Sequence, residues 1–225
     1  EDKTLMTLCE VLSDVLPMAD IAVLSGPSHA EEVGRGIPTT CVISGPERET
    51  AEYLQGIFMS PLFRVYTTPD TLGVELGGSL KNVIALAAGT ADGLGYGDNT
   101  KAALITRGIK EISRLGVAMG ANTETLNGLS GIGDLIVTCA SRHSRNRKAG
   151  MLIGRGYSMQ QAMDEVKMVV EGVYSAKAAI ALAKKYEINM PIIEQVNAVL
   201  FENQPAKDAV MELMLRDKKA EHEDI

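Results

Sequence analysis

A lysine and an asparagine, Lys81 and Asn82, stand inside an otherwise apolar stretch that begins at Leu76. A lysine held in a partly apolar cleft can have a lowered pKa, which makes it a usable proton donor and acceptor. Gly77 and Gly78 cost about 1 kcal/mol each relative to alanine inside a helix, so they indicate close approach of another backbone or of a ligand. Most helix lysines simply extend to solvent. The pattern alone therefore leaves both interpretations open.

A single carboxylate, Asp134, ends the glycine-rich segment 128–133 and precedes an apolar run. The segment has the composition of a loop. An aspartate in this position caps a helix or enters a site. It can also do both, accepting helix amides with one oxygen while the other oxygen orients a lysine.

A basic cluster spans residues 141–148 and contains Ser144, Arg145 and Asn146 at the expected start of a helix. Hydroxyl, guanidinium, amide and helix dipole together suit a phosphate dianion. The alternatives are a solvated basic turn or an RNA contact. The net charge of −7 disfavours extended RNA binding, because such binding needs a concentrated positive surface.

Two further polar positions lie next to expected strands or helix starts. Gly26 and Ser28 follow a short apolar run, where glycine permits close approach and backbone amides and the serine hydroxyl can face an anion. An ordinary Gly-Pro turn explains these residues equally well. Glu171 follows Val169 and Val170 just before a helical pattern, and it suits either a ribose hydroxyl or the helix end itself.

Composition excludes several functional classes. The three cysteines have no CxxC spacing and too few neighbouring histidines for a metal site, so we expect no metal and a reducing compartment. No apolar run approaches the roughly 20 residues that span a bilayer, and no segment resembles a secretory signal. The acidic balance disfavours nucleic acid and anionic membranes as partners. We therefore expect a cytoplasmic protein without a membrane span.

Periodicity divides the chain into two parts. Helical spacing over 5–16, apolar runs at 21–24, 38–43 and 62–66, and a helix start after Gly45-Pro46 predict α/β structure for residues 1–68. Strand signals then vanish, and residues 69–225 carry helical patterns at 70–89, 100–119, 172–186 and 192–201, with a capping box at Ser158 and Gln161. The fold class is thus mainly α with an α/β N-terminal remnant.

Taken in order, five clusters resemble bacterial NAD(P)-dependent glycerol-3-phosphate dehydrogenase over about Leu5 to Leu215. They are Gly-Pro-Ser-His-Ala, Leu-Lys-Asn-Val-Ile-Ala, Gly-Leu-Ser-Gly-Ile-Gly-Asp-Leu, Ser-Arg-Asn-Arg and Val-Val-Glu-Gly. The resemblance implies that residues 1–68 are the end of an NAD(P)-binding Rossmann domain. It implies that residues 69–225 form an all-helical catalytic domain like that of 6-phosphogluconate dehydrogenase.

The resemblance also implies roles for individual residues. Lys81 is the proton donor to the C2 carbonyl of dihydroxyacetone phosphate and the acceptor in reverse, and Asp134 lies beside it. The other expected substrate contacts are Gly26, Ser28, Ser144, Arg145 and Asn146. The expected contacts to a dissociable NADP or NAD are Ala30, Arg145, Val169 and Glu171. The product, sn-glycerol 3-phosphate, supplies the glycerophospholipid backbone, and the expected assembly is a homodimer.

The chain departs from the family's pattern at its beginning. No G-x-G-x-x-G segment follows a strand, and the first residue is Glu1. We therefore expect the first part of the nucleotide domain to lie outside this chain, and the chain alone to bind NAD(P)H poorly. Two alternatives remain open. One is a 3-hydroxyacid dehydrogenase or ketopantoate reductase, which the adjacency of Lys81 and Asn82 disfavours. The other is a non-catalytic helical oligomerisation or binding module.

Overall fold

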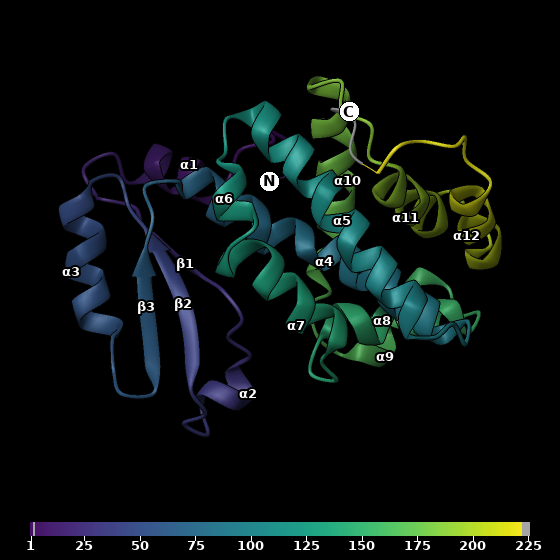
Figure 1. Cartoon of the computed structure of the whole chain (residues 1–225), viewed down its shortest axis with the longest axis horizontal. Coiled ribbons are helices and arrows are strands. Elements are labelled where there is room, and N and C mark those ends of the chain that lie inside the picture. The colour runs from purple at the N-terminus through teal and green to yellow at the C-terminus, as the bar shows by residue number, and fades with distance from the viewer. Residues whose placement is uncertain (2, 222–225) are drawn as a thin grey trace.

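The computed structural model describes residues 1 and 3–221. The chain is mainly helical, with a small three-stranded sheet near its N-terminus. Figure 1 shows this sheet and α3 (Arg48–Phe58) at one end of the molecule, and α11 (Pro191–Phe201) and α12 (Ala206–Met214) at the other. The predicted fold class is confirmed. The predicted end of the helical part, residues 222–225, lies outside the described residues.

The N-terminal part alternates helices and strands. Its elements are α1 (Leu8–Val15), β1 (Val23–Ser25), α2 (Ala30–Val33), β2 (Thr39–Ser44), α3 (Arg48–Phe58) and β3 (Phe63–Thr67). The strand order is β1-β2-β3, with β1 antiparallel and β3 parallel to β2. A small buried cluster of Ile43, Ala51 and Val65 joins the sheet to α3.

Two predicted boundaries in this part are wrong. The helix expected from residue 5 begins at Leu8, because Leu5 has a positive φ of 61° and Thr7 caps the helix in a capping box with Glu10. The strand expected over 21–24 is β1, Val23–Ser25. The other two strands lie within one residue of their predicted positions.

Ten elements make up the rest of the described residues, up to residue 221. They are α4 (Thr71–Gly93), α5 (Asp98–Met119), α6 (Thr123–Leu126), the π-helical turn η1 (Leu129–Gly133), α7 (Asp134–Ala140), α8 (Arg145–Gly154), α9 (Met159–Val166), α10 (Glu171–Lys185), α11 (Pro191–Phe201) and α12 (Ala206–Met214). The predicted helices at 70–89, 100–119, 172–186 and 192–201 correspond to α4, α5, α10 and α11, and the Ser158–Gln161 capping box begins α9.

Helix α4 is the centre of the helical part. It contacts α5, α7, α8, α10 and α11, and half of its residues are buried. It crosses α8 closely because glycines face each other there: a β-carbon on Gly93 would lie 3.0 Å from the Cα of Gly154. At the same crossing, Asp92 pairs with Lys101 of α5 at 2.9 Å and with Arg147 of α8 at 2.7 Å. These contacts fix α8 against α4.

The segment 128–133 is not the loop that its composition predicts. Residues Leu129–Gly133 form the π-helical turn η1, which runs without a break into α7. Glycine allows this turn to approach α4, because a β-carbon on Gly77 would lie only 2.5 Å from the carbonyl oxygen of Ser130. The close approach expected at Gly77 is therefore that of a backbone, and it places the start of α7 beside the middle of α4.

Candidate active site

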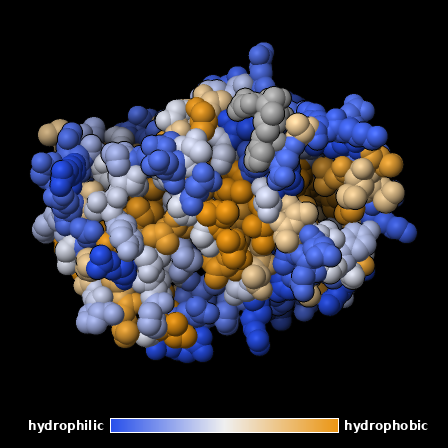
Figure 2. All heavy atoms as spheres, in the orientation of Figure 1, coloured by the Kyte–Doolittle hydropathy of each residue, from blue (hydrophilic) through white to orange (hydrophobic). Residues whose placement is uncertain are grey.

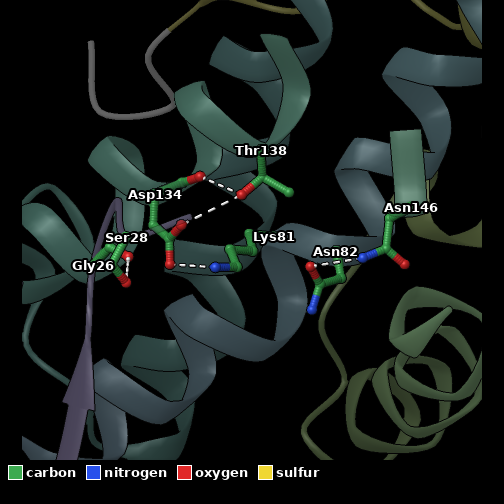
Figure 3. A network of polar contacts seen from close by, with 7 residues as sticks. All are labelled: Gly26, Ser28, Lys81, Asn82, Asp134, Thr138 and Asn146. Carbon is green, nitrogen blue, oxygen red and sulfur yellow. Dashed lines mark hydrogen bonds and ion pairs between the residues drawn. The ribbon is translucent and has the colours of Figure 1, made fainter. Parts of the chain in front are cut away.

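Lys81 projects from the middle of α4 toward the first residue of α7. Its Nζ donates to Oδ2 of Asp134, and the two side chains are only 18% and 4% exposed (Figure 3). The capping role considered for Asp134 is wrong: α7 continues from η1, and Asp134 accepts no amide at the helix start. Its carboxylate instead holds the lysine, as the second interpretation of the sequence required.

Thr138 completes this arrangement one helical turn after Asp134. Its hydroxyl donates to the carbonyl oxygen of Asp134 at 2.6 Å and lies 3.3 Å from Oδ1 of the same residue. Burial raises the pKa of Asp134, while the Lys81 cation and the two side-chain hydrogen bonds oppose that rise. The group is thus a buried, oriented carboxylate whose nearest cation is the candidate catalytic lysine.

The lysine borders a cleft of about 770 Å³ between the N-terminal segment, α4, α8 and α10. Five of the predicted site residues line it: Lys81, Ser144, Arg145, Asn146 and Glu171. Thr138, whose hydroxyl contacts the carboxylate of Asp134, also lines it. The structure therefore gathers the candidate proton-transfer group, Lys81, and the expected phosphate-binding cluster around one space, although they are more than 60 residues apart in sequence.

The phosphate-type cluster sits at the N-terminal end of α8. Ser144 is the N-cap, and its hydroxyl accepts from the backbone N–H of Arg147 at 3.1 Å. Arg145 pairs with Glu171 of α10, with 2.6 Å between guanidinium and carboxylate. The side chain of Asn146 is buried between α4 and α10. A guanidinium at a helix N-terminus on a cleft wall is suited to bind a phosphate group.

The remaining predicted contacts do not line the cleft. Gly26 and Ser28 lie in the β1–α2 turn near Asp134 (Figure 3), where the Ser28 hydroxyl donates to the Gly26 carbonyl at 3.0 Å. Gly26 has φ 140° and packs against Cys41, so glycine is required there by both conformation and space. Ala30 begins α2, and Val169 is 60% exposed just before α10. Their ligand roles remain predictions.

Sequence reasoning did not assign roles to four residues that border this site. Thr138 was detectable from its spacing, because a residue four positions after Asp134 lies on the same helix face. Asn82 lines the cleft beside Lys81. His29 and His143 also line it, with ring centroids 6.1 Å apart, and Nε2 of His29 is buried without a hydrogen-bond partner in the described chain. No sequence pattern indicated that these two histidines meet.

Neither a metal cluster nor a membrane-spanning helix is found among residues 1 and 3–221. No group of three or more histidine, cysteine, aspartate or glutamate side chains there is placed to hold a metal ion. No helix in the same residues is long and apolar enough to cross a bilayer. The cysteines of this part are free thiols, and burial raises the pKa of Cys139 to about 12.

Two family models match the chain. The model for the C-terminus of NAD-dependent glycerol-3-phosphate dehydrogenase matches residues 70–211, and the model for the N-terminus of the same family matches residues 1–51. Both models belong to one enzyme family, and together they cover most of the chain in the expected order.

Curated proteins and solved structures agree with these models. The chain is 71% identical over 222 residues to glycerol-3-phosphate dehydrogenase [NAD(P)+] of Agathobacter rectalis, covering 99% of this chain and 66% of that protein. It is 66% identical to the Fusobacterium nucleatum enzyme of the same name, covering 98% and 67%. The crystal structure of glycerol-3-phosphate dehydrogenase from Coxiella burnetii superposes with a TM-score of 0.92 at 41% identity, covering 95% of this chain and 66% of that one.

The chain therefore spans about two thirds of the length of these relatives. The two matched models cover strands β1 and β2, the central helix α4 and the residues that line the cleft, and β3 lies between the two matched ranges. By all three comparisons, the chain belongs to the NAD-dependent glycerol-3-phosphate dehydrogenase family.

Proposed function

We propose that this chain is the substrate-binding and catalytic portion of an enzyme that reversibly reduces dihydroxyacetone phosphate to sn-glycerol 3-phosphate with NADPH or NADH. The product would supply the glycerophospholipid backbone. The observation that carries the proposal is the buried Lys81–Asp134 pair at the edge of the cleft that Arg145 lines. A ketone reduction needs an acid at the developing alkoxide, and a phosphate ester needs a cation nearby.

In this proposal Lys81 moves the proton. The reduced nicotinamide, when bound, supplies hydride to C2 of the substrate. The Lys81 ammonium donates one proton to the C2 oxygen, so the carbonyl becomes a secondary alcohol and the amine is neutral until solvent reprotonates it. Asp134 orients the ammonium group, and Thr138 holds the carboxylate through its hydroxyl. In the reverse direction the neutral amine accepts the hydroxyl proton.

The cleft walls fit part of a dinucleotide. Arg145 offers a guanidinium for a phosphate, and Glu171 offers a carboxylate for a ribose hydroxyl, but here the two side chains pair with each other. A G-x-G-x-x-G segment, the usual pyrophosphate site, is absent from the sequence. We therefore expect weak nucleotide binding and little activity from this polypeptide alone. The cofactor in this proposal is NADP or NAD, without a metal.

We propose the same two-part organisation as the sequence suggests, with residues 1–68 ending a nucleotide-binding domain and 69–225 forming the substrate domain. All three strands of the described residues precede α4, which supports that division.

We further propose a homodimer in a reducing, cytoplasmic compartment, which the free cysteines suit. Figure 2 shows apolar atoms gathered in the middle of one face, and large apolar side chains such as Val117 and Ile136 are about half exposed.

The test is a rate measurement on a chimera in which the upstream third of a curated relative precedes Glu1. We expect oxidation of NADPH or NADH that depends on dihydroxyacetone phosphate, and much less with dihydroxyacetone, which lacks the phosphate. A chimera that binds NADPH but reduces neither ketone would refute the proposal. So would a chimera that prefers a 3-hydroxyacid or ketopantoate as substrate. Light scattering of the same chimera tests the dimer.

A further inference from the structure

Helix α1 is tied to the helical part of the chain by a hydrogen bond between two residues that line the cleft. The backbone N–H of Cys9, in the first turn of α1, donates to Oε1 of Glu75 on α4 at 2.9 Å. Cys9 and Glu75 are 66 positions apart in sequence, and both line the cleft that Lys81 borders. Glu75 therefore joins α1 to the helix that carries the candidate catalytic lysine.

The amide of Cys9 needs a partner from outside α1. The first amides of a helix have no carbonyl partner within that helix. The capping box of α1 satisfies the amides of Thr7 and Glu10 with each other's side chains, and it leaves the amide of Cys9 over. A carboxylate at a helix N-terminus also interacts favourably with the helix dipole. Glu75 provides the missing acceptor from α4.

Little else in the described part of the chain holds α1 against α4. No residue of α1 is buried, although Leu5, just before it, packs against the main core. Another hydrogen bond between the two parts joins the hydroxyls of Ser44 and Thr71 at 2.7 Å. It lies at the end of β2 and the start of α4, and neither residue lines the cleft. The contact with Glu75 therefore sets how far α1 lies from α4.

This spacing determines the shape of the cleft. The wall on the N-terminal side is lined by Glu1, Leu5, Met6, Thr7, Leu8, Cys9 and Leu12. The wall on the helical side carries Lys81 and Arg145, the candidate proton donor and the expected phosphate contact. Reacting groups must approach to about 3 to 3.5 Å, and a misplacement of about 1 Å can lower a rate a hundredfold. A change in the distance between the two walls therefore alters the space in which the reaction occurs.

We propose that Glu75 is a positioning residue that fixes α1 relative to α4 and so holds the N-terminal wall of the cleft where the reaction needs it. The part of Glu75 that acts is its acceptor oxygen. Its negative charge is not required, because its partner is a neutral backbone amide. This proposal rests on the proposed function, and it assigns Glu75 no contact with substrate or cofactor.

Three substitutions at Glu75 separate the acceptor oxygen from the charge. Glu75→Gln keeps the length and an acceptor oxygen but loses the charge, Glu75→Asp keeps the charge but is one methylene shorter, and Glu75→Ala removes both. In the chimera we expect Glu75→Gln to keep kcat with dihydroxyacetone phosphate within about threefold. Glu75→Asp and Glu75→Ala should each lower kcat about tenfold. The KM should change less, because Lys81 and Arg145 keep their places on the helical part.

Two kinetic results would overturn the proposal. A Glu75→Asp enzyme as active as Glu75→Gln, or more active, would show that the charge of Glu75 matters rather than its reach to Cys9. A Glu75→Ala enzyme with unchanged kcat would show that the contact does not influence the reaction. If Glu75→Ala does not fold, the comparison of Glu75→Gln with Glu75→Asp decides.

Hydrogen exchange at the Cys9 amide measures the contact without any catalysis. In the chain itself we expect this amide to exchange about fivefold faster in Glu75→Ala and Glu75→Asp than in the unsubstituted protein, because it loses its acceptor. In Glu75→Gln the exchange rate should stay near that of the unsubstituted protein. NMR measures the rates. Equal rates in all four proteins would show that Glu75 does not hold α1, and would overturn the proposal.

Ser44→Ala is the matched control. It removes the hydrogen bond to Thr71, which also joins the two parts but lies away from the cleft. We expect it to lower the melting temperature and to leave both kcat and the exchange rate at Cys9 unchanged. A tenfold loss of kcat in this control would assign the effect of Glu75 to general loosening between the two parts and would overturn the positioning role.

The outcomes for the two proposals are distinguishable. An unsubstituted chimera that binds NADPH but does not reduce dihydroxyacetone phosphate refutes the proposed function, and the positioning role is refuted with it even where exchange at Cys9 demonstrates the contact. An active chimera in which Glu75→Ala leaves kcat unchanged refutes the positioning role alone.

Discussion

The sheet-containing part before α4 and the helical part after it bury their apolar side chains very differently. In the first, the cluster between the sheet and α3 has three buried members. Helix α1 has no buried residue, and its Leu8 and Val15 are about 70% exposed. In the second, one continuous cluster runs from Leu76 to Leu200 and draws on nearly every helix. Burial of apolar surface is the main stabilising term in folding, so the helical part holds most of the stability within this chain.

The same contrast applies to chemistry. The Lys81–Asp134 pair, the candidate for proton transfer, and the cleft-lining Arg145 come from α4, α7 and α8. The N-terminal turn contributes groups that bond to their own backbone, such as Ser28. Rigid, well-packed elements hold catalytic groups more accurately than turns do. The better-packed part is thus also the part that carries the candidate catalytic groups.

The largest expected effect tests that division of chemistry. Lys81→Ala in the chimera should lower kcat about a thousandfold, within the range for loss of a general acid, while Ser28→Ala should lower it less than tenfold. The Ser28 hydroxyl is already engaged with Gly26, so little is lost with it. Steady-state rates with dihydroxyacetone phosphate measure both values of kcat. Equal losses of kcat in the two variants would contradict the conclusion that the helical part carries the catalytic groups.

The second prediction concerns the two cores. Leu115→Ala, at a fully buried position of α5, should lower the free energy of unfolding by about 3 to 4 kcal/mol through lost contacts and a cavity. Val65→Ala in β3 removes fewer atoms and should cost about 2 kcal/mol. Its effect should appear as faster hydrogen exchange in the sheet alone, with the helical part protected as before. Exchange that accelerates equally in α4 and α5 would show that the two parts unfold together.

Helix starts in the two parts provide a third prediction. Helix α1 is capped locally by Thr7 and Glu10, but α11 is capped from α5 by Glu111, whose carboxylate accepts from Ile192 at 2.9 Å and is 2% exposed. Burial raises the pKa of Glu111 to about 7 from 4.5, partly opposed by these amide hydrogen bonds. The native state therefore binds a proton that the unfolded chain releases between those two values.

The sign of the pH effect follows from that raised pKa. The stability due to the proton on Glu111 is fully present below pH 4.5 and is lost as pH rises through about 7. Relative to Glu111→Gln, which does not titrate, the unsubstituted chain should lose about 3 kcal/mol across this window. Urea unfolding of both proteins at pH 5 and pH 8 measures the difference.

The local cap of α1 should show no such pH dependence: Thr7→Ala should lower the free energy of unfolding by about 1 kcal/mol at both pH values. A stability difference between Glu111→Gln and the unsubstituted chain that does not vary with pH contradicts the argument.

The smallest expected effects compare ion pairs. Asp92→Asn leaves the largely buried cations of Lys101 and Arg147 without their carboxylate and should cost about 2 kcal/mol, below the range for fully buried pairs because water reaches this one. Arg48→Ala breaks the exposed pair with Glu52 on α3 and should leave the melting temperature unchanged. Both values come from thermal unfolding at low and high salt. A larger loss of stability for Arg48→Ala than for Asp92→Asn would contradict the expectation that the buried pairs contribute more.

Local patterns predicted the helices well because α4, α5, α10 and α11 carry long apolar periodicity and clear end signals. Lys81 and Asp134 were predicted as candidate site residues because each is a charged residue next to an apolar stretch, and because the family resemblance implies it. They did not predict that residues 129–133 form a π-turn, because glycine-rich composition fits a loop equally well. Nor could spacing show that Asn146 faces both Asn82 and Gly172, since that contact depends on how closely α8 crosses α4.

Because the π-turn η1 leads directly into α7, the number of residues in η1, as well as their types, determines where Asp134 points. Successive residues of a helix are rotated by about 100°, because an α-helix has 3.6 residues per turn. Since η1 runs directly into α7, removing one residue from Leu129–Gly133 would turn Asp134 away from Lys81 even if every remaining side chain were kept. Residue type is constrained there as well, because a β-carbon on Gly131 would clash with the carbonyl oxygen of Leu126. A natural homologue with a deletion in this segment would have lost the lysine's partner.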